Sequence, residues 1–218
     1  NRTISANPLR FPHLNCSPLI MRLLLNCTLD YWQDFLSPKE ADDLFQEFVS
    51  AHQIADSFIN YTINGEAFRS DFGKITVVDQ TLYDKDAFPE AIYGKTMIWP
   101  ASLQLIKERI EKMTQRAFQF CVCIYYPDGN SGVAFHSDPP AYGDTTVIPS
   151  LSLGEERNFQ LREIKTGAIH EMILNKGSLL LMGEHCQERY EHCLPVDPSY
   201  KKARINMTFR QFGFEKNT

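Results

Sequence analysis

The sequence predicts a mainly β protein, a sandwich or barrel of strands with two helices packed outside it. Three observations indicate this class. Two segments of the N-terminal half place apolar residues at helical spacing, and from Phe118 onward the chain is a series of short apolar runs separated by turns. Helices and strands also do not alternate in the β-α-β order of a parallel sheet. With 218 residues the chain can build one substantial core, so a single domain is expected.

The first helix is expected to begin at Ser37. Before it, residues 1–18 are predicted to be irregular and residues 19–26 to form a buried strand. Ser37 can cap a helix, the proline after it fits the first helical turn, and Glu40 completes a capping box. Apolar residues at helical spacing extend the predicted helix to about Ile54.

A second helix is expected directly after Trp99-Pro100. Lys107 belongs to its polar face, and its apolar face consists of Leu103, Ile106, Ile110 and Met113. Between the two helices, residues 61–99 mix short β-like runs with turn residues. Beyond the second helix, strands are expected over residues 118–126, 133–135, 147–153, 159–164, 168–174, 178–182 and 204–212.

Composition restricts the class of protein. The chain contains 15 Phe and 9 Tyr, too many aromatic residues for a disordered chain. Its formal net charge of −5 argues against a protein that coats nucleic acid through bulk positive charge. No apolar run approaches the length of a membrane-spanning helix, and no cysteine pair has C-x-x-C spacing. We therefore expect reduced thiols, no membrane contact, and an intracellular protein, cytoplasmic or nuclear rather than secreted.

His136-Ser137-Asp138 is the first candidate for chemistry. It follows a strand-like run, and residues two apart on a strand point to the same face. One imidazole and one carboxylate at a common point make two thirds of the facial triad that binds non-haem iron(II). His192 is the preferred third ligand because a further strand follows it, with His185 as the competitor. Each of these residues taken alone is equally typical of a loop or surface position.

The segment from Arg204 to Arg210 alternates strictly between polar and apolar residues. As a strand it places Arg204, Asn206, Thr208 and Arg210 on one face. Two guanidinium groups bracketing an amide and a hydroxyl suit a dianion, because a guanidinium fork binds carboxylates bidentately. The cosubstrate 2-oxoglutarate is such a dianion.

In this order, H-x-D, a distal histidine and R-x-N-x-T-x-R resemble the AlkB-like iron(II)/2-oxoglutarate dioxygenases. The resemblance covers roughly residues 23–212 and includes Tyr125-Tyr126-Pro127-Asp128-Gly129. It implies a double-stranded β-helix, or jelly roll, at about 118–212, within one domain at 19–218. Residues 61–99 would then form a lid that recognises substrate.

The resemblance also implies roles for individual residues. His136, Asp138 and His192 would bind iron, Arg204 and Tyr126 would bind 2-oxoglutarate, and Asn206 and Arg210 would support the cosubstrate and the iron-ligating carboxylate. The implied reaction consumes O₂ and 2-oxoglutarate, yields succinate and CO₂, and releases an N-methyl group of a nucleic-acid base as formaldehyde. A monomer is expected.

Two departures from the family pattern concern the substrate. Ile124 replaces the asparagine that repair members usually carry two residues before the strand tyrosine, and Pro139-Pro140 replaces an acid that reads a flipped base. Candidate substrate contacts are Arg157 and the aromatic residues Phe68, Phe72, Tyr83, Phe88, Tyr93 and Trp99, most of which are equally typical of core packing. Alkylated nucleic acid, single-stranded rather than duplex, is the first expectation. A protein side chain or a small molecule is the alternative, and a catalytically dead binding module is the third.

Overall fold

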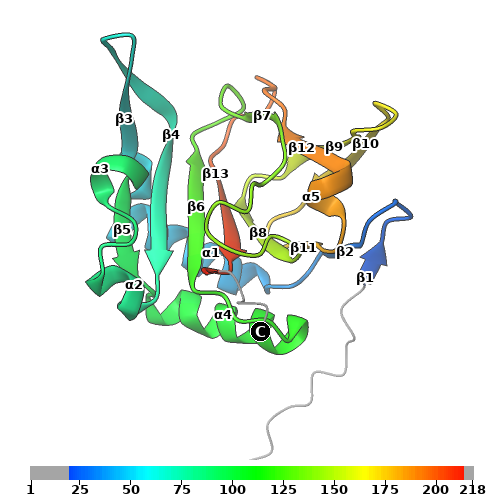
Figure 1. Ribbon diagram of the computed structural model, residues 1–218, viewed down its shortest axis with the longest axis horizontal. Helices are drawn as coiled ribbons and strands as arrows, with labels where there is room; N and C mark the ends of the chain where they lie inside the picture. Colours follow the sequence, from blue (N-terminus) through cyan, green and yellow to red (C-terminus); the bar gives the residue numbers. More distant parts are fainter. Residues whose placement is uncertain (1–19, 214–218) are drawn as a thin grey trace, which may run out of the picture.

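The computed structural model describes residues 20–213, which form two β-sheets facing one another (Figure 1). The predicted irregular segment 1–18 lies outside the described residues. The larger sheet has nine strands, in the spatial order β1 (Ile20–Arg22), β2 (Leu29–Trp32), β11 (Leu179–Met182), β8 (Ile148–Gly154), β13 (Arg204–Arg210), β6 (Phe120–Tyr126), β4 (Glu66–Val78) and β3 (Phe58–Ile63), with β5 (Lys95–Ile98) parallel to β4. The smaller sheet is β10 (Ile169–Leu174), β9 (Arg157–Glu163), β12 (Tyr190–Leu194) and β7 (Val133–His136). This confirms the predicted jelly roll.

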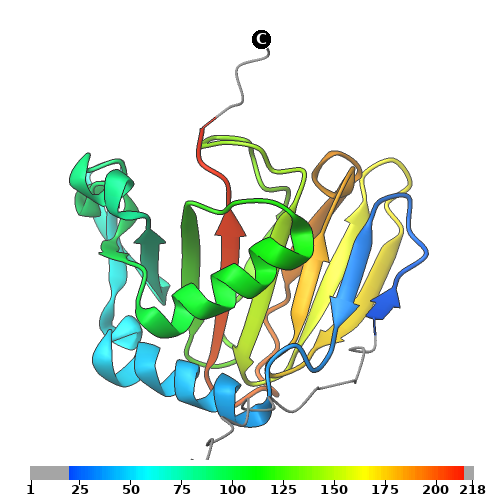
Figure 2. The ribbon, with the colours of Figure 1, turned by 90° about the horizontal axis from the view of Figure 1, so that it is seen from below.

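Two helices cover the outer face of the larger sheet, as Figure 2 shows. They are α1 (Pro38–Gln46) and α4 (Ala101–Thr114). The capping box at Ser37 is present, since Ser37 accepts from the Glu40 backbone while the Glu40 carboxylate accepts from the Ser37 N–H. The core beneath the helices joins their apolar faces to the sheet through Leu44, Phe48, Leu103, Ile110, Ile75, Val77, Leu151, Ile205, Met207 and Phe209.

Several local predictions were wrong. One helix was expected to reach Ile54, but α1 ends at Gln46. A π-helical turn (Glu47–Ala51) follows it directly, and a separate 3₁₀ turn (Ile54–Asp56) comes after that. The long strand expected over 19–26 is the short β1, and β2 was not expected. On α4, Lys107 is buried because its ammonium pairs with Asp79, while Met113 is 37% exposed.

The segment between the two helices is more regular than its sequence suggests. It contains the long β3–β4 hairpin, the short helices α2 (Gln80–Asp84) and α3 (Glu90–Tyr93), and β5. Among the helices of residues 20–213, none is long and apolar enough to cross a membrane. A last short helix, α5 (Cys186–Arg189), precedes β12.

Candidate active site

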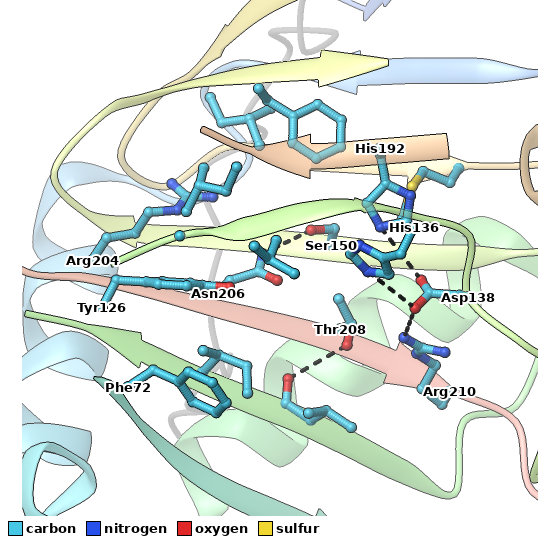
Figure 3. Close-up of a pocket in the computed structure, with 18 residues that line it drawn as sticks. Phe72, Tyr126, His136, Asp138, Ser150, His192, Arg204, Asn206, Thr208 and Arg210 are labelled. Carbon is cyan, nitrogen blue, oxygen red and sulfur yellow. Dashed lines mark hydrogen bonds and ion pairs between the residues drawn. The ribbon is translucent and has the colours of Figure 1, made fainter. Parts of the chain in front are cut away.

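A pocket lies between the two sheets, with a volume of about 260 Å³ (Figure 3). Its polar floor comes from alternate residues of β13, whose apolar residues pack beneath the helices on the other face. The smaller sheet supplies the opposite wall. The lining includes Tyr126, Ile124, Val122, Phe72, Ser150, Phe159, Met182, Leu194, and the four polar residues of β13.

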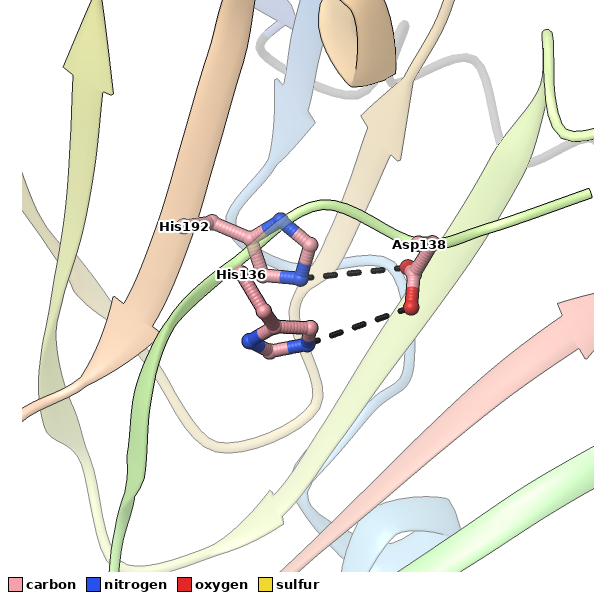
Figure 4. A group of neighbouring side chains, drawn as sticks. All are labelled: His136, Asp138 and His192. Atoms are coloured by element: carbon pink, nitrogen blue, oxygen red, sulfur yellow. Dashed lines mark ion pairs between the residues drawn. The ribbon is translucent and has the colours of Figure 1, made fainter. Parts of the chain in front are cut away.

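At one end of the pocket, His136, Asp138 and His192 converge (Figure 4). Their ligand atoms all lie within 4.8 Å of one another, and together they could hold a metal ion. The carboxylate of Asp138 lies 3.9 Å from Nε2 of His136 and 3.8 Å from Nε2 of His192. The predicted grouping of the three side chains is therefore present in the fold.

Strand pairing brings the two histidines together. β7 and β12 are antiparallel neighbours in which His136 lies directly opposite His192. His192 lies within β12, a strand that was not expected, and the predicted further strand follows it as β13. Asp138 is not on the strand with His136 either. β7 ends at His136, and the carboxylate reaches the same point from the following loop.

Both histidines suit metal binding through Nε2. Nδ1 of His136 lies 2.9 Å from the backbone oxygen of Ala134, and since a carbonyl can only accept, Nδ1 is the donor of this contact and Nε2 is the ring nitrogen that faces Asp138. Burial lowers the pKa of His192 from 6.5 to about 4, although the nearby Asp138 opposes the shift. Two imidazoles and one carboxylate, without a thiolate, are the donor set of non-haem iron(II) sites.

Three hydrogen bonds hold Asp138 and its loop. Arg210 donates from Nη2 to Oδ1 of Asp138 at 2.7 Å. The backbone N–H of Asp138 donates to Oε1 of Gln187 on α5 at 2.8 Å. The neighbouring Ser137 hydroxyl donates to the backbone oxygen of Tyr190. Arg210 therefore orients the carboxylate directly, and the other two hydrogen bonds fix the loop that presents it.

Gln187→Leu is expected to weaken Mn²⁺ binding by roughly 10- to 100-fold, the usual cost of losing a group that orients a metal ligand. The reason is that leucine cannot accept from the Asp138 N–H. Calorimetric titration of the metal-free protein measures this directly. Gln187→Glu replaces the accepting amide oxygen with a carboxylate oxygen, which can also accept. This variant should therefore bind Mn²⁺ more tightly than the leucine variant. Equal affinities of wild type and Gln187→Leu would contradict this role.

At the other end of the pocket, Arg204 is buried with an incompletely paired guanidinium. It is 1% exposed and donates from Nη2 to the Ser152 hydroxyl at 2.8 Å, while Nε and Nη1 have no partner. Within residues 20–213 no carboxylate pairs with it. Burial lowers the pKa of Arg204 to about 10. An unpaired buried charge is costly, so this end of the pocket suits an anionic ligand.

Tyr126 stands beside Arg204 because β6 and β13 pair these two residues across the ladder. Burial raises the pKa of Tyr126 to about 12, so its hydroxyl remains a hydrogen-bond donor at neutral pH. In the middle of the floor, Asn206 donates to the Ser150 hydroxyl at 2.8 Å. A cation at one end and a metal-binding triad at the other fit a ligand with a carboxylate at each end, as 2-oxoglutarate has.

Among the candidate substrate contacts, Phe72 lines the pocket, whereas Phe68, Phe88 and the other four lie outside its lining. Arg157 is fully buried and donates to the backbone oxygens of three loop residues, Asp128, Ser131 and Pro195. Trp99 stacks on Phe209 and donates to Asp79. Tyr93 packs with Phe88 and Tyr142, and Tyr83 is exposed on α2. No contact in the structure supports a substrate role for these four, which stays a prediction.

Some residues of the site were not expected from the sequence. Ser150 and Ser152 could have been found, because two hydroxyls alternate with leucines in an otherwise apolar strand. Gln187 carries no such signal, since its role depends on where α5 packs. The same holds for Phe159, Leu174 and Met182, which form the apolar wall of the pocket.

Comparison with known proteins agrees with this site. The family profile described as the 2OG-Fe(II) oxygenase superfamily matches residues 28–210. The mouse protein named alpha-ketoglutarate-dependent dioxygenase alkB homolog 3 is 32% identical over 122 residues, which are 51% of this chain and 43% of that protein. The bovine DNA oxidative demethylase ALKBH2 is 29% identical over 203 residues, which are 86% of this chain and 69% of that protein. The chain thus spans less than half the length of the alkB homolog 3 relatives.

The solved structure of OsALKBH1 shares the fold. It superposes with a TM-score of 0.59 at 14% sequence identity, covering 88% of this chain and all of that one. The pocket, the triad and the two arginines of β13 all fall inside the region that matches the superfamily.

Proposed function

The chain belongs to the 2OG-Fe(II) oxygenase superfamily, and we propose that it removes alkyl groups from nucleic-acid bases by oxidation. The observation that carries the oxygenase assignment is the pocket with a two-histidine, one-carboxylate triad at one end and an unpaired buried arginine at the other. The names of the ALKBH2 relatives, DNA oxidative demethylases, support the substrate class.

In this proposal the triad, the two arginines, Tyr126 and Asn206 each have a defined role. His136, Asp138 and His192 hold Fe(II), and Arg210 orients the carboxylate of Asp138 through a charge-assisted hydrogen bond. Arg204 and Tyr126 bind the far carboxylate of 2-oxoglutarate, and Asn206 supports its middle. Bound iron, with 2-oxoglutarate and O₂, supplies the oxidation of a substrate C–H bond, after which an N-methyl group leaves as formaldehyde and succinate and CO₂ are released.

The β3–β4 hairpin supports a flat, aromatic substrate. Phe72 of β4 lines the pocket, and Phe68 lies four residues before it on the same strand. Tyr61 of β3 stacks on Phe68, with ring centroids 5.9 Å apart, and both rings are more than 40% exposed. Exposed aromatic rings beside a pocket are suited to stacking on nucleobases. These rings support a proposed lid on the hairpin rather than at Tyr83, Tyr93 or Trp99.

Single-stranded nucleic acid is the proposed form of the substrate. The net charge of −5 leaves little bulk attraction for a duplex, and Arg204 and Arg210 are engaged inside the pocket. A single copy of the chain supplies both the triad and the buried arginine, and the proposed active form is a monomer. The five cysteines that the structure describes are free thiols, which supports an intracellular location, cytoplasmic or nuclear.

Incubation with N-methylated single-stranded oligonucleotides, Fe(II) and 2-oxoglutarate is expected to remove a CH₂ mass for each methyl group, as measured by mass spectrometry. The matching duplex should react more slowly. If the protein consumes 2-oxoglutarate with Fe(II) but leaves every methylated oligonucleotide intact, the proposed substrate class is wrong and the oxygenase assignment stands.

One observation favours a second substrate class. Ile124 lies in the pocket opposite Asn206 across the β6–β13 ladder, so the wall there is apolar. An apolar wall suits an alkyl chain or an apolar side chain as well as it suits a base. The same chemistry on a protein side chain or a small molecule is therefore the alternative, and the oligonucleotide assay separates the two.

A further inference from the structure

Cys27 and Cys186 meet although they are 159 residues apart in sequence. Cys27 lies in the loop between β1 and β2, and Cys186 is the first residue of α5 (Figure 1). The thiol of Cys186 donates to the sulfur of Cys27 at 2.8 Å. A disulfide bond is about 2.05 Å long, so the two sulfurs need to approach by only about 0.8 Å to bond.

The backbone around the two cysteines is fixed on both sides of the pair. Next to Cys27, the N–H of Thr28 donates to the backbone oxygen of Glu184 at 3.0 Å, and the N–H of Gly183 donates back to Thr28 at 2.8 Å. On the other side, the guanidinium of Arg189 donates to the backbone oxygen of Asn26 at 2.7 Å. The proximity of the sulfurs is therefore built into the packing of the loop against α5.

The two thiols differ in access and in acidity. Cys27 is half-buried and follows Asn26, which lines a surface groove with Glu163, Lys165 and Arg189, whereas Cys186 is 2% exposed. The hydrogen bond from Cys186, aided by the charge of Arg189, lowers the pKa of Cys27. The same hydrogen bond, together with burial, raises the pKa of Cys186. A small oxidant therefore meets Cys27 first, and Cys27 is the more readily ionised of the two thiols.

We propose that Cys27 and Cys186 are a redox-active dithiol pair that closes to a disulfide in the presence of hydrogen peroxide. The sulfur of Cys27 attacks one peroxide oxygen, forming an S–O bond and breaking the O–O bond, and the hydroxide that leaves takes up a proton to become water. The sulfur of Cys186 then attacks the sulfenic acid on Cys27, and the departing hydroxyl leaves as a second water with the proton of Cys186. In total two thiols are oxidised by two electrons and one peroxide is reduced.

The disulfide bond would link the loop of residues 23–28 to α5, the helix that contacts the loop of Asp138 at the candidate metal site. Gln187, the neighbour of Cys186 on α5, accepts from the backbone N–H of Asp138. The remaining described cysteines offer no comparable pair with solvent access. Cys121 and Cys123 are 0% exposed, and Cys193 donates to the side chain of Gln160.

Peptide mapping of the full-length chain tests the proposal. The protein is treated with hydrogen peroxide, its remaining thiols are alkylated, and it is digested with trypsin without reductant. Cleavage after lysine and arginine places Cys27 in peptide 23–39 and Cys186 in peptide 177–189. We expect these peptides to be linked in most molecules and to separate after dithiothreitol. Recovery of both peptides unlinked, or of peptide 23–39 linked to peptide 11–22 with Cys16, would overturn the proposal.

Two variants sharpen the test. Cys186→Ser lacks the thiol that would attack the sulfenic acid, so dimedone should trap a sulfenic acid on Cys27. If Cys27 stays unlabelled, it is not the thiol that attacks the peroxide. Cys193→Ser is the matched control, a buried thiol outside the pair, and it should keep the linked peptides. Loss of the link in Cys193→Ser would likewise overturn the assignment. None of these readouts depends on catalytic activity, so the result is independent of the proposed function.

Discussion

Replacing His192 with alanine is expected to abolish Fe(II)-dependent turnover of 2-oxoglutarate. Groups that merely orient a metal ligand cost about 10- to 100-fold when removed, so the loss of a ligand itself should exceed ~10²-fold. His192 lies at the centre of the site, 8% exposed and with Nε2 aimed at the carboxylate of Asp138. Succinate formation and Mn²⁺ affinity should fall together, because both depend on the same three ligands.

His185 provides the matched control. It is the other histidine of this region, pairs with Glu188 on the surface, and does not line the pocket. Its backbone is left-handed, with φ of 66°, a conformation that asparagine tolerates better than most residues. His185→Asn should therefore retain near wild-type turnover. Loss of activity in His185→Asn but not in His192→Ala would reassign the third metal ligand.

Arg204→Ala is expected to raise the KM for 2-oxoglutarate with a smaller effect on kcat. Truncating one partner of a buried, hydrogen-bonded charge pair costs about 2–5 kcal/mol, which corresponds to roughly 30- to 5,000-fold in affinity. The steady-state dependence of succinate formation on 2-oxoglutarate measures the change. Mn²⁺ affinity in the absence of 2-oxoglutarate should stay unchanged, because Arg204 is at the far end of the pocket from the triad.

Two further variants separate charge from geometry. Arg204→Lys keeps the positive charge but loses the planar fork, so its KM should lie between those of wild type and Arg204→Ala. Lys202→Ala removes an exposed cation two residues away and should leave KM unchanged. An unchanged KM in Arg204→Ala would remove this residue from the cosubstrate site.

The site could be predicted from the sequence to the extent that it depends on local periodicity. The alternation from Arg204 to Arg210 has period two, and a strand converts that period into a polar face directly. The meeting of His136 with His192 required the family resemblance, since the pairing of β7 with β12 brings together residues that are far apart in sequence. Composition and spacing contain no information on that register.

The substrate side of the site was the least predictable. Aromatic residues such as Trp99 and Tyr93 have no feature in sequence that separates core packing from a binding surface, and the fold uses both for packing. Arg157 likewise supports loops through backbone oxygens, a role that depends on tertiary contacts. Phe68 was a candidate from the sequence, but Tyr61 was recognised only because the hairpin stacks its ring on Phe68.

The central claim is that this pocket turns over 2-oxoglutarate with Fe(II). Succinate formation by the wild-type chain, measured with Fe(II), O₂ and 2-oxoglutarate and with a methylated single-stranded oligonucleotide present or absent, tests it most directly. We expect succinate that requires Fe(II), increases with the methylated oligonucleotide, and disappears in His192→Ala. The absence of succinate from the Fe(II)-loaded wild-type protein under both conditions would contradict the claim and favour a catalytically dead binding module.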